Sequence, residues 1–444
     1  MSANSDSSGR HPAAASYCRH HNYPDGGSVR HAQAVSVWLI VNQIDNQPTT
    51  RDDVVAMLVK RNAAGVLIKL AKGYPVVTVT GPRQSGKTTL VRQVFTDKPY
   101  ASLEDPDQRE FAGQDPRGFL AQFSKGAILD EVQRCPALLS YLQRIVDEAR
   151  APGMYILTGS QQFGLLSGVT QSLAGRVALL TLLPFSLREL NRLGHVPATL
   201  DAVLVTGSYP PIHDRNLDPP VWYANYIATY LERDVRQLLN VHDLSNFQRF
   251  LRLCAGRTGQ LLNLSGLAND CGITHNTAKA WISVLEASFI VSLLPPHHAN
   301  FNKRLVKTPK LYFLDTGLAA WLLGIKSAAD LTAHAMRGAL FETWVLSELL
   351  KQRYETGQPS NLFFWRDRTG NEVDVLADTG AKLVPLEIKA GATLNADFFT
   401  ALTRWRELAG TQAGPAHLVY GGDSLVTRGG VRVVPWRQLP ELWD

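Results

Sequence analysis

Apolar residues between positions 52 and 157 follow a pattern of helices that alternate with short buried strands. They recur at helical spacing from residue 54 to residue 70 and stop at Gly73. Residues 75–80, Pro-Val-Val-Thr-Val-Thr, are short, apolar and β-branched, as expected of a buried parallel strand. Further apolar runs lie at 127–129 and 154–157. Strands that alternate with helices predict a doubly wound parallel sheet.

The hydrophobic pattern becomes almost wholly helical after residue 210. Residues 264–294 run as a helix, a turn at Gly272, a second helix and an apolar strand, which is the order of a winged helix-turn-helix. The second helix, expected at 274–285, would face a nucleic-acid groove. A lid or a protein contact is the open alternative. The side chains available to a groove are His275, Asn276, Lys279 and Ser283.

A third block begins near residue 336 with a helix and continues with strands. The predicted fold class is therefore α/β, with a parallel-sheet core, a helical and winged-helix middle region and a C-terminal α/β domain. By composition the N-terminal residues form a polar, disordered tail. The expected boundaries are 1–50 for the tail, 51–210 for the parallel-sheet domain, 211–335 for the helical region and 336–444 for the last domain.

Composition adds only mild constraints. A formal net charge of +6 and a pI of about 9.1 permit a polyanionic partner without demonstrating one. The four cysteines form no CxxC pair, so neither a disulfide framework nor a zinc site is indicated, and a reducing compartment fits. The longest apolar run near the N-terminus, 37–41, is far too short to span a membrane. We therefore expect a cytoplasmic protein without a membrane span.

The strongest chemical signal is the segment 81–88, Gly-Pro-Arg-Gln-Ser-Gly-Lys-Thr, which satisfies G-x-x-x-x-G-K-[ST]. In this motif glycines let backbone N–H groups surround phosphates, the lysine neutralises them and the hydroxyl reaches Mg²⁺. The following helix points its positive end at the anion. ATP and Mg²⁺ are therefore the expected cofactors. The expected nucleotide-binding residues are Gly81, Pro82, Arg83, Gln84, Ser85, Gly86, Lys87, Thr88, Thr89 and Ser160.

Two further strands end in polar residues. Asp130 and Glu131 follow the strand at 127–129, where Asp130 and Thr88 would hold the metal and Glu131 would polarise the attacking water. Ser160 ends the strand at 154–157, at the edge of the sheet where nucleotide binds in such folds. Arg176 follows closely, and either stabilises the transition state or forms a surface salt bridge.

The third block contains three acids and a lysine at suggestive positions. Asp374 and Glu387 lie on successive strands, Lys389 is on the same face as Glu387, and Glu342 is on a preceding helix. Charges in the apolar strand at 383–388 are expensive unless they are compensated. The layout favours a magnesium site for phosphodiester cleavage, with Lys389 catalytic. An ordinary surface sheet is the bland alternative.

Several segments together resemble the bacterial AAA-family ATPases that carry a C-terminal domain with a restriction-endonuclease-like core. The matching residues are 81–89, 129–133, 157–160, 173–176, 230–235, 313–318, 372–374 and 387–389. The resemblance implies a fold similar to the PD-(D/E)xK nucleases and places Glu342, Asp374, Glu387 and Lys389 in its pocket. Val373 stands where such nucleases have proline, which weakens the expectation of cleavage.

Two functions follow from these patterns. The first is an ATPase whose nucleotide state controls a metal-dependent DNA-processing domain. The second is a nucleotide-gated regulatory or binding protein, such as a defence or toxin–antitoxin effector, with an inactive nuclease fold. DNA and a second copy of the chain are candidate partners for both.

Overall fold

The computed structural model describes residues 59–160, 172–231, 244–297 and 307–443. Residues 59–444 belong to one compact unit. The tail expected at 1–50 and part of the matching segment 230–235 lie outside the described residues.

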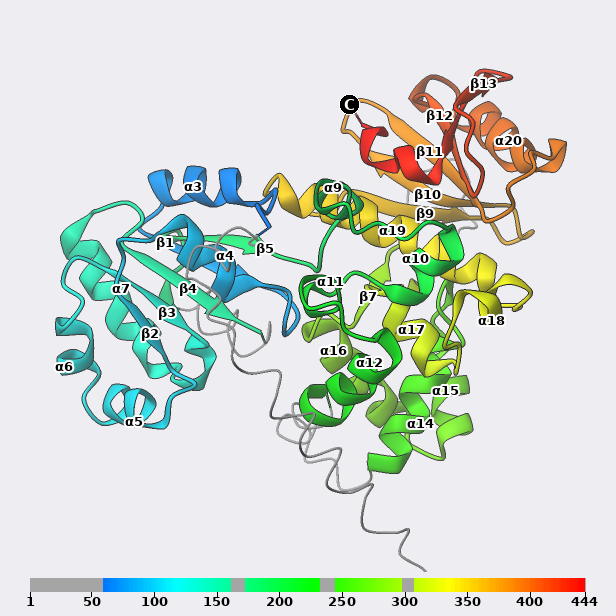
Figure 1. The fold of residues 1–444 in the computed structure, drawn as a ribbon. Helices are drawn as coiled ribbons and strands as arrows, with labels where there is room; N and C mark the ends of the chain where they lie inside the picture. Colours follow the sequence, from blue (N-terminus) through cyan, green and yellow to red (C-terminus); the bar gives the residue numbers. More distant parts are fainter. Residues whose placement is uncertain (1–58, 161–171, 232–243, 298–306, 444) are drawn as a thin grey trace, which may run out of the picture. The chain divides into compact units, whose positions relative to one another are not determined.

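The first part of the unit is a five-stranded, wholly parallel sheet in the order β2-β3-β4-β1-β5 (Figure 1). The doubly wound parallel sheet predicted from the sequence is confirmed. Its elements are α3 (Ala64–Gly73), β1 (Val76–Thr80), α4 (Lys87–Val94), β2 (Tyr100–Ser102), α5 (Pro106–Gln114), α6 (Pro116–Ala121), β3 (Ala127–Asp130), α7 (Ala137–Ala149), β4 (Tyr155–Gly159) and β5 (Val177–Thr181).

Helices cover both faces of this sheet. Val77 and Val79 of β1 pack with α3 and α4, whereas Val76 packs with the core formed by α5, α6 and α7. All five residues of β1 are buried, which explains its unbroken apolar and β-branched sequence. The strand is thus fixed between two cores and delivers residue 81 to the carboxyl edge of the sheet.

The middle region is helical, as expected, with a three-stranded sheet in the order β6-β8-β7. Gly272 adopts a left-handed conformation between α15 and α16, and Thr274 caps α16 by accepting from the Thr277 amide. The elements are α9 (Leu187–Leu193), α10 (Leu200–Thr206), α11 (Pro210–Asp214), α12 (Pro219–Tyr226), α14 (Leu244–Ala255), β6 (Gln260–Leu261), α15 (Leu264–Cys271), α16 (His275–Ala287), β7 (Val291–Leu294), β8 (Lys310–Phe313), α17 (Thr316–Leu322) and α18 (Ala328–Thr332).

The C-terminal part has a mixed six-stranded sheet in the order β13-β14-β12-β11-β10-β9. Strands β9, β10 and β11 are antiparallel neighbours, whereas β12 runs parallel to β11 and to β14. The elements are α19 (Arg337–Glu355), β9 (Leu362–Arg366), β10 (Glu372–Asp378), β11 (Leu383–Lys389), α20 (Thr400–Ala409), β12 (Ala416–Tyr420), β13 (Val426–Arg428), β14 (Val431–Pro435) and the 3₁₀ segment η5 (Trp436–Glu441).

One hydrophobic core joins the middle region to one face of the C-terminal sheet. It contains Phe250 and Trp281 from the middle helices, Phe341 of α19, and Leu386 and Val419 of the sheet. The opposite face of the sheet packs against α20 in a separate cluster. The boundary expected at 335 therefore does not separate two independent cores.

Candidate functional sites

The turn between β1 and α4 has the backbone that its glycines and polar residues predict. Gly86 has φ 89° and Gln84 φ 60°, both left-handed. Gly81 has φ 150°, and a Cβ atom there would lie 2.0 Å from the carbonyl oxygen of Leu182. Because β5 passes so closely, only glycine fits at residue 81. We call residues 81–88 the phosphate loop, after the motif that they carry.

Lys87, Thr88 and Asp130 lie together at the carboxyl edge of the sheet. The buried Lys87 ammonium donates to the carbonyls of Gly81 and Pro82 at 3.0 and 2.7 Å. The Thr88 hydroxyl donates to the Asp130 carboxylate, 3.2 and 3.0 Å from its two oxygens. The predicted metal-holding pair is thus in direct contact.

Asp130 has two more partners from neighbouring strands. Tyr100 at the start of β2 donates its hydroxyl to Oδ2 at 2.7 Å, and the Thr158 hydroxyl of β4 donates to Oδ1. Burial and the hydrogen bond to Asp130 raise the pKa of Tyr100, so it remains a donor. Three hydroxyl groups therefore fix the orientation of a carboxylate on the edge of a parallel sheet.

Glu131 leaves the strand in a left-handed conformation, with φ 54°. Its carboxylate accepts from the side-chain amide of Gln133 and, at 3.1 Å, from the Ser160 hydroxyl. Its backbone N–H donates to Thr158 Oγ1 at 3.3 Å. A non-glycine residue with positive φ is uncommon and is held only by surrounding contacts, which is frequent at functional sites.

Arg176 does not lie at this edge. It precedes β5, and its carbonyl accepts from the amide of Val76 at the amino end of β1. The phosphate loop follows the other end of β1, about 15 Å away at the rise of a β-strand. The guanidinium pairs with Asp147 of α7 at 2.5 Å and is partly exposed. Arg176 follows Ser160 closely in sequence, and we therefore expected it at the carboxyl edge of its own sheet. This expectation is wrong, because Arg176 lies at the start of β5, and β5 begins at the amino edge of the sheet.

The four predicted residues of the C-terminal block do converge. The Asp374 carboxylate accepts from the amide of Ile388 at 2.8 Å, and Lys389 Nζ lies 2.5 Å from Glu387 and 3.7 Å from Asp374. Burial, and then the charge of Asp374, raise the pKa of Glu387 to about 8. Burial and Asp374 likewise raise the pKa of Glu342 to about 7. We call Glu342, Glu372, Asp374 and Glu387 the acidic pocket.

Lys310, at the start of β8 in the middle region, reaches into the acidic pocket. Its ammonium lies 3.0 Å from Glu342 and forms a second ion pair with Glu372. Burial would lower the pKa of Lys310, but Glu342, Asp374 and Glu372 together raise it, so the lysine is charged. The Tyr312 hydroxyl, two residues along β8, donates to Glu342 at 2.5 Å.

The carboxylates of the acidic pocket are therefore paired with Lys310 and Lys389. Among the described residues, no three His, Cys, Asp or Glu side chains are placed to hold one metal ion. Within this group of side chains, the buried Oε2 of Glu387 has no hydrogen-bond partner. Lys310 and Lys389 occupy oxygens of Glu342, Glu387 and Asp374, so a divalent ion would bind these carboxylates only if the ion pairs opened.

The helix-turn-helix side chains point as predicted. His275, Asn276 and Lys279 of α16 are exposed, while Ala278 and Ile282 are buried in the core. Ser283 is half-buried. The exposed face is compatible with a groove, and DNA contact remains a prediction.

Sequence reasoning missed three residues that these sites use. Lys310 carried a usable signal, because it begins the apolar strand 310–314 and a charge there needs compensation, the argument that identified Lys389. Tyr100 and Arg61 carried none. Arg61 lies before α3, and its guanidinium donates to the carbonyl of Ser85 in the phosphate loop at 2.6 Å.

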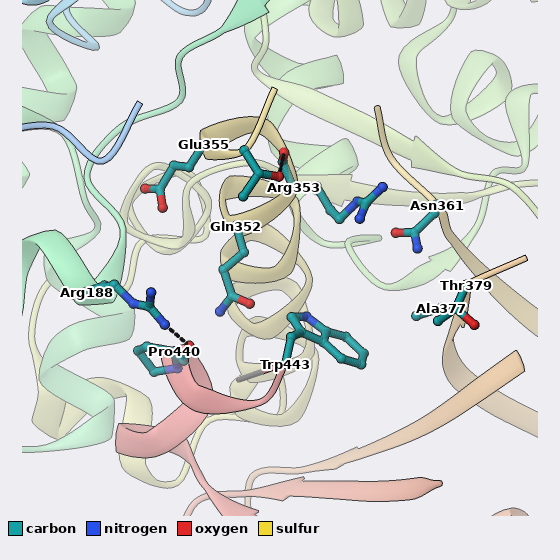
Figure 2. A pocket seen from close by; sticks show the side chains of 10 residues that line it. Arg188, Gln352, Arg353, Glu355, Asn361, Ala377, Thr379, Pro440 and Trp443 are labelled. Carbon is teal, nitrogen blue, oxygen red and sulfur yellow. Dashed lines mark hydrogen bonds between the residues drawn. The ribbon is translucent and has the colours of Figure 1, made fainter. Parts of the chain in front are cut away.

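A separate cavity of about 460 Å³ lies at the C-terminal end of α19 (Figure 2). Gln352, Arg353 and Glu355 line it from the helix, and Trp443 lines it from the end of the chain. Arg188 of α9 donates to the carbonyl of Pro440 at 2.5 Å beside it. Among the described residues, no helix has the length and apolar character needed to cross a membrane.

Three segments of the chain match known family models. Residues 73–191 match the family described as AAA domain, and residues 198–329 and 337–439 each match a domain of unknown function, DUF8612 and DUF4143. The uncharacterized proteins Rv2008c of Mycobacterium tuberculosis and Mb2031c of Mycobacterium bovis are each 33% identical over 352 residues. These matches cover 78% of this chain and 77% of each relative.

Among solved structures, the Walker-type ATPase PABY2304 of Pyrococcus abyssi is 16% identical, with a TM-score of 0.41. That likeness covers 63% of this chain and 99% of the archaeal one.

Proposed function

Because the chain belongs to the family of these two mycobacterial proteins and carries an AAA P-loop ATPase domain over residues 73–191, we propose that it hydrolyses ATP at the phosphate loop. The observation that carries the proposal is the meeting of Lys87, Thr88, Asp130 and Glu131 at the carboxyl edge of one parallel sheet. The ATPase domain implies nucleotide binding with Mg²⁺.

Each of these groups has a role that its chemistry suits. Backbone N–H groups of the phosphate loop and the Lys87 ammonium bind the β- and γ-phosphates. Thr88 and Asp130 would hold Mg²⁺, which would supply positive charge against the phosphate oxygens. Glu131, held by Gln133 and Ser160, orients the attacking water and accepts its proton.

Loss of ATP turnover in Lys87→Ala tests the proposal. The variant should bind ATP at least 100-fold more weakly, because an oxygen-binding cation is removed from a buried position. Its measured turnover should fall to the level of a blank. Turnover equal to that of the unaltered protein would refute hydrolysis at this loop.

For the C-terminal domain, we propose a nucleotide-gated regulatory or binding role. The observation that favours it over metal-dependent cleavage is the pairing of Glu342 and Glu372 with Lys310, a lysine from outside the predicted nuclease-like layout. Incubation with Mn²⁺ and single- or double-stranded DNA, with and without ATP, discriminates the two roles. No cleavage is expected; cleavage that Asp374→Ala and Lys389→Ala abolish would establish the nuclease instead.

A further inference from the structure

Arg61 is a buried residue outside the phosphate loop that hydrogen-bonds to the backbone of the loop. It is 5% exposed, and its three guanidinium nitrogens each donate to a different group. Nη1 donates to the carbonyl of Ser85 at 2.6 Å, Nη2 to the carbonyl of Leu183 at 2.7 Å, and Nε to Glu189 at 2.9 Å. The residue thus connects the phosphate loop, the segment after β5 and helix α9.

The contact with Ser85 determines the direction of a phosphate-binding amide. In a trans peptide the C=O and the following N–H point in opposite directions. When Arg61 holds the Ser85 carbonyl on its own side, the Gly86 N–H is directed away from Arg61. Gly86 also has a left-handed conformation, which is sterically accessible but not enforced for glycine. A fixed hydrogen bond therefore reduces the freedom of this peptide group.

Glu189 keeps Arg61 in place. Its carboxylate is fully buried, and Oε1 also accepts from the backbone N–H of Asn62 at 2.8 Å. Oε2 accepts from the amide of Ser186 at 3.0 Å, which caps α9. Only the planar fork of arginine has donors spaced for all three of its acceptors, so lysine cannot replace it.

Asn62, the residue after Arg61, and the segment between β5 and α9 both contact α19. The Asn62 side chain donates to Glu355 at 2.7 Å, in the last turn of the helix. Closer to its middle, Glu348 accepts from the amide of Leu187 at 2.7 Å, and Lys351 donates to the carbonyl of Phe185 at 2.9 Å. Glu355 also lines the cavity at the end of α19 (Figure 2).

We propose that Arg61 is a positioning residue for the phosphate loop, and that Asn62 and Glu355 connect this support to α19, so that the C-terminal domain influences nucleotide affinity. The inference rests on the proposed function for the identity of the ligand. Beyond the proposed hydrolysis, it assigns a role in nucleotide binding to Arg61, which lies outside the phosphate loop, and to α19 of the C-terminal domain.

The test compares Arg61→Lys with the unaltered full chain. Binding of ADP and of inorganic pyrophosphate is measured by calorimetry, and ATP turnover is measured at saturating ATP. Arg61→Lys releases the Ser85 carbonyl, so the Gly86 N–H must be ordered when the ligand binds, and we expect about tenfold weaker binding of both ligands. Turnover at saturation should change much less, because bound substrate and transition state lose the same support.

Arg257→Lys is the matched control. Arg257 also pairs with a carboxylate, that of Asp270, but lies in the middle region away from the loop. It should leave both affinities unchanged, and thermal melting shows whether either variant has lost its fold. Unchanged affinity in folded Arg61→Lys would overturn the proposal. If the unaltered chain binds ADP but does not turn over ATP, the hydrolysis proposal fails while the comparison of Arg61 variants still stands.

Asn62→Ala and Glu355→Gln test the connection to α19. Each should weaken ADP binding by about threefold: Asn62→Ala removes the bond to Glu355 together with those to Ser186 and Arg192, whereas Glu355→Gln weakens only the bond between Asn62 and residue 355. Affinities equal to that of the unaltered chain in both variants would overturn the influence of the C-terminal domain.

A second inference comes from the acidic pocket. We infer that Lys310 is its resident cation and excludes divalent metal ions. Four carboxylates face two lysines there: Lys310 pairs with Glu342 and Glu372, and Lys389 pairs with Glu387 and Asp374. Lys310 comes from β8 of the middle region, a strand whose four residues are all buried, so its ammonium is held beside the acids.

Calorimetry with Mn²⁺ alone tests this inference on the full chain. The unaltered protein should show no binding that depends on Asp374, whereas Lys310→Met should gain one site that Asp374→Asn removes. Lys310→Met leaves buried acids unpaired, so Lys310→Met combined with Glu372→Gln is measured as well. Equal Asp374-dependent binding with and without Lys310, or no gain in either folded variant, would overturn the inference.

Discussion

Gly81 is constrained directly by the packing of the sheet. A Cβ atom at this position would meet the Leu182 carbonyl at 2.0 Å, and the residue has φ 150°. The motif at 81–88 predicted a glycine for a tight approach to phosphate. The structure adds a second reason, the approach of the chain that leaves β5.

We therefore expect Gly81→Ala to destabilise the protein by about 2 kcal/mol or more and to abolish nucleotide binding, because the backbone must shift. Gly65→Ala is the control, since no atom lies within 4 Å of a Cβ there and the residue is inside α3. It should raise stability slightly, by about 0.5–1 kcal/mol. Urea unfolding measures both, and equal effects of the two substitutions would show that the contact with Leu182 is unimportant.

At the scale of elements, the direction of β5 fixes which edge of the sheet Arg176 occupies. β5 runs parallel to β1, so Arg176 lies at the amino edge of the sheet, whereas the phosphate loop of the same subunit lies at the carboxyl edge. Within one subunit the guanidinium cannot reach that loop. Any action on nucleotide must therefore be on the site of a neighbouring copy.

Arg176→Ala should lower ATP turnover more than affinity, and only at protein concentrations where copies associate. Its midpoint of thermal unfolding should change little, because the pair with Asp147 lies at the surface. Turnover is measured across a dilution series together with the oligomeric state. Unchanged turnover at every concentration would make Arg176 a surface ion pair only.

The elements themselves were largely predictable, while their contacts were not. Periodicity and glycines placed β1, the phosphate loop and the pair α15 and α16 correctly, because each pattern is local. The bond between Asn62 and Glu355 joins residues 293 positions apart, and no local pattern encodes it. The same limit applies to Lys310, whose partners lie on α19 and β10.

At the scale of the whole molecule, the middle region and the C-terminal sheet share a hydrophobic core. Leu386 of β11 and Phe341 of α19 belong to the same cluster as Phe250 and Trp281. A C-terminal piece alone would expose these apolar side chains to water. Such exposure costs roughly 25 cal/mol of folding free energy for each Å² of apolar surface.

We therefore expect residues 336–444 expressed alone to lack a cooperative unfolding transition, whereas residues 198–444 should show one. Circular dichroism during heating compares the two pieces. A cooperative transition in the shorter piece would mean that the shared core is dispensable, and that the boundary at 335 is a true domain boundary.

In the proposed ATP hydrolysis, Glu131 orients the attacking water and does not hold the nucleotide. Measuring ATP affinity and turnover on the same preparation of Glu131→Gln tests it most directly. We predict affinity within about threefold of the unaltered protein and turnover lower by a factor of about 100 or more, because the substitution removes only the proton acceptor. Equal turnover in Glu131→Gln and the unaltered protein would contradict the account.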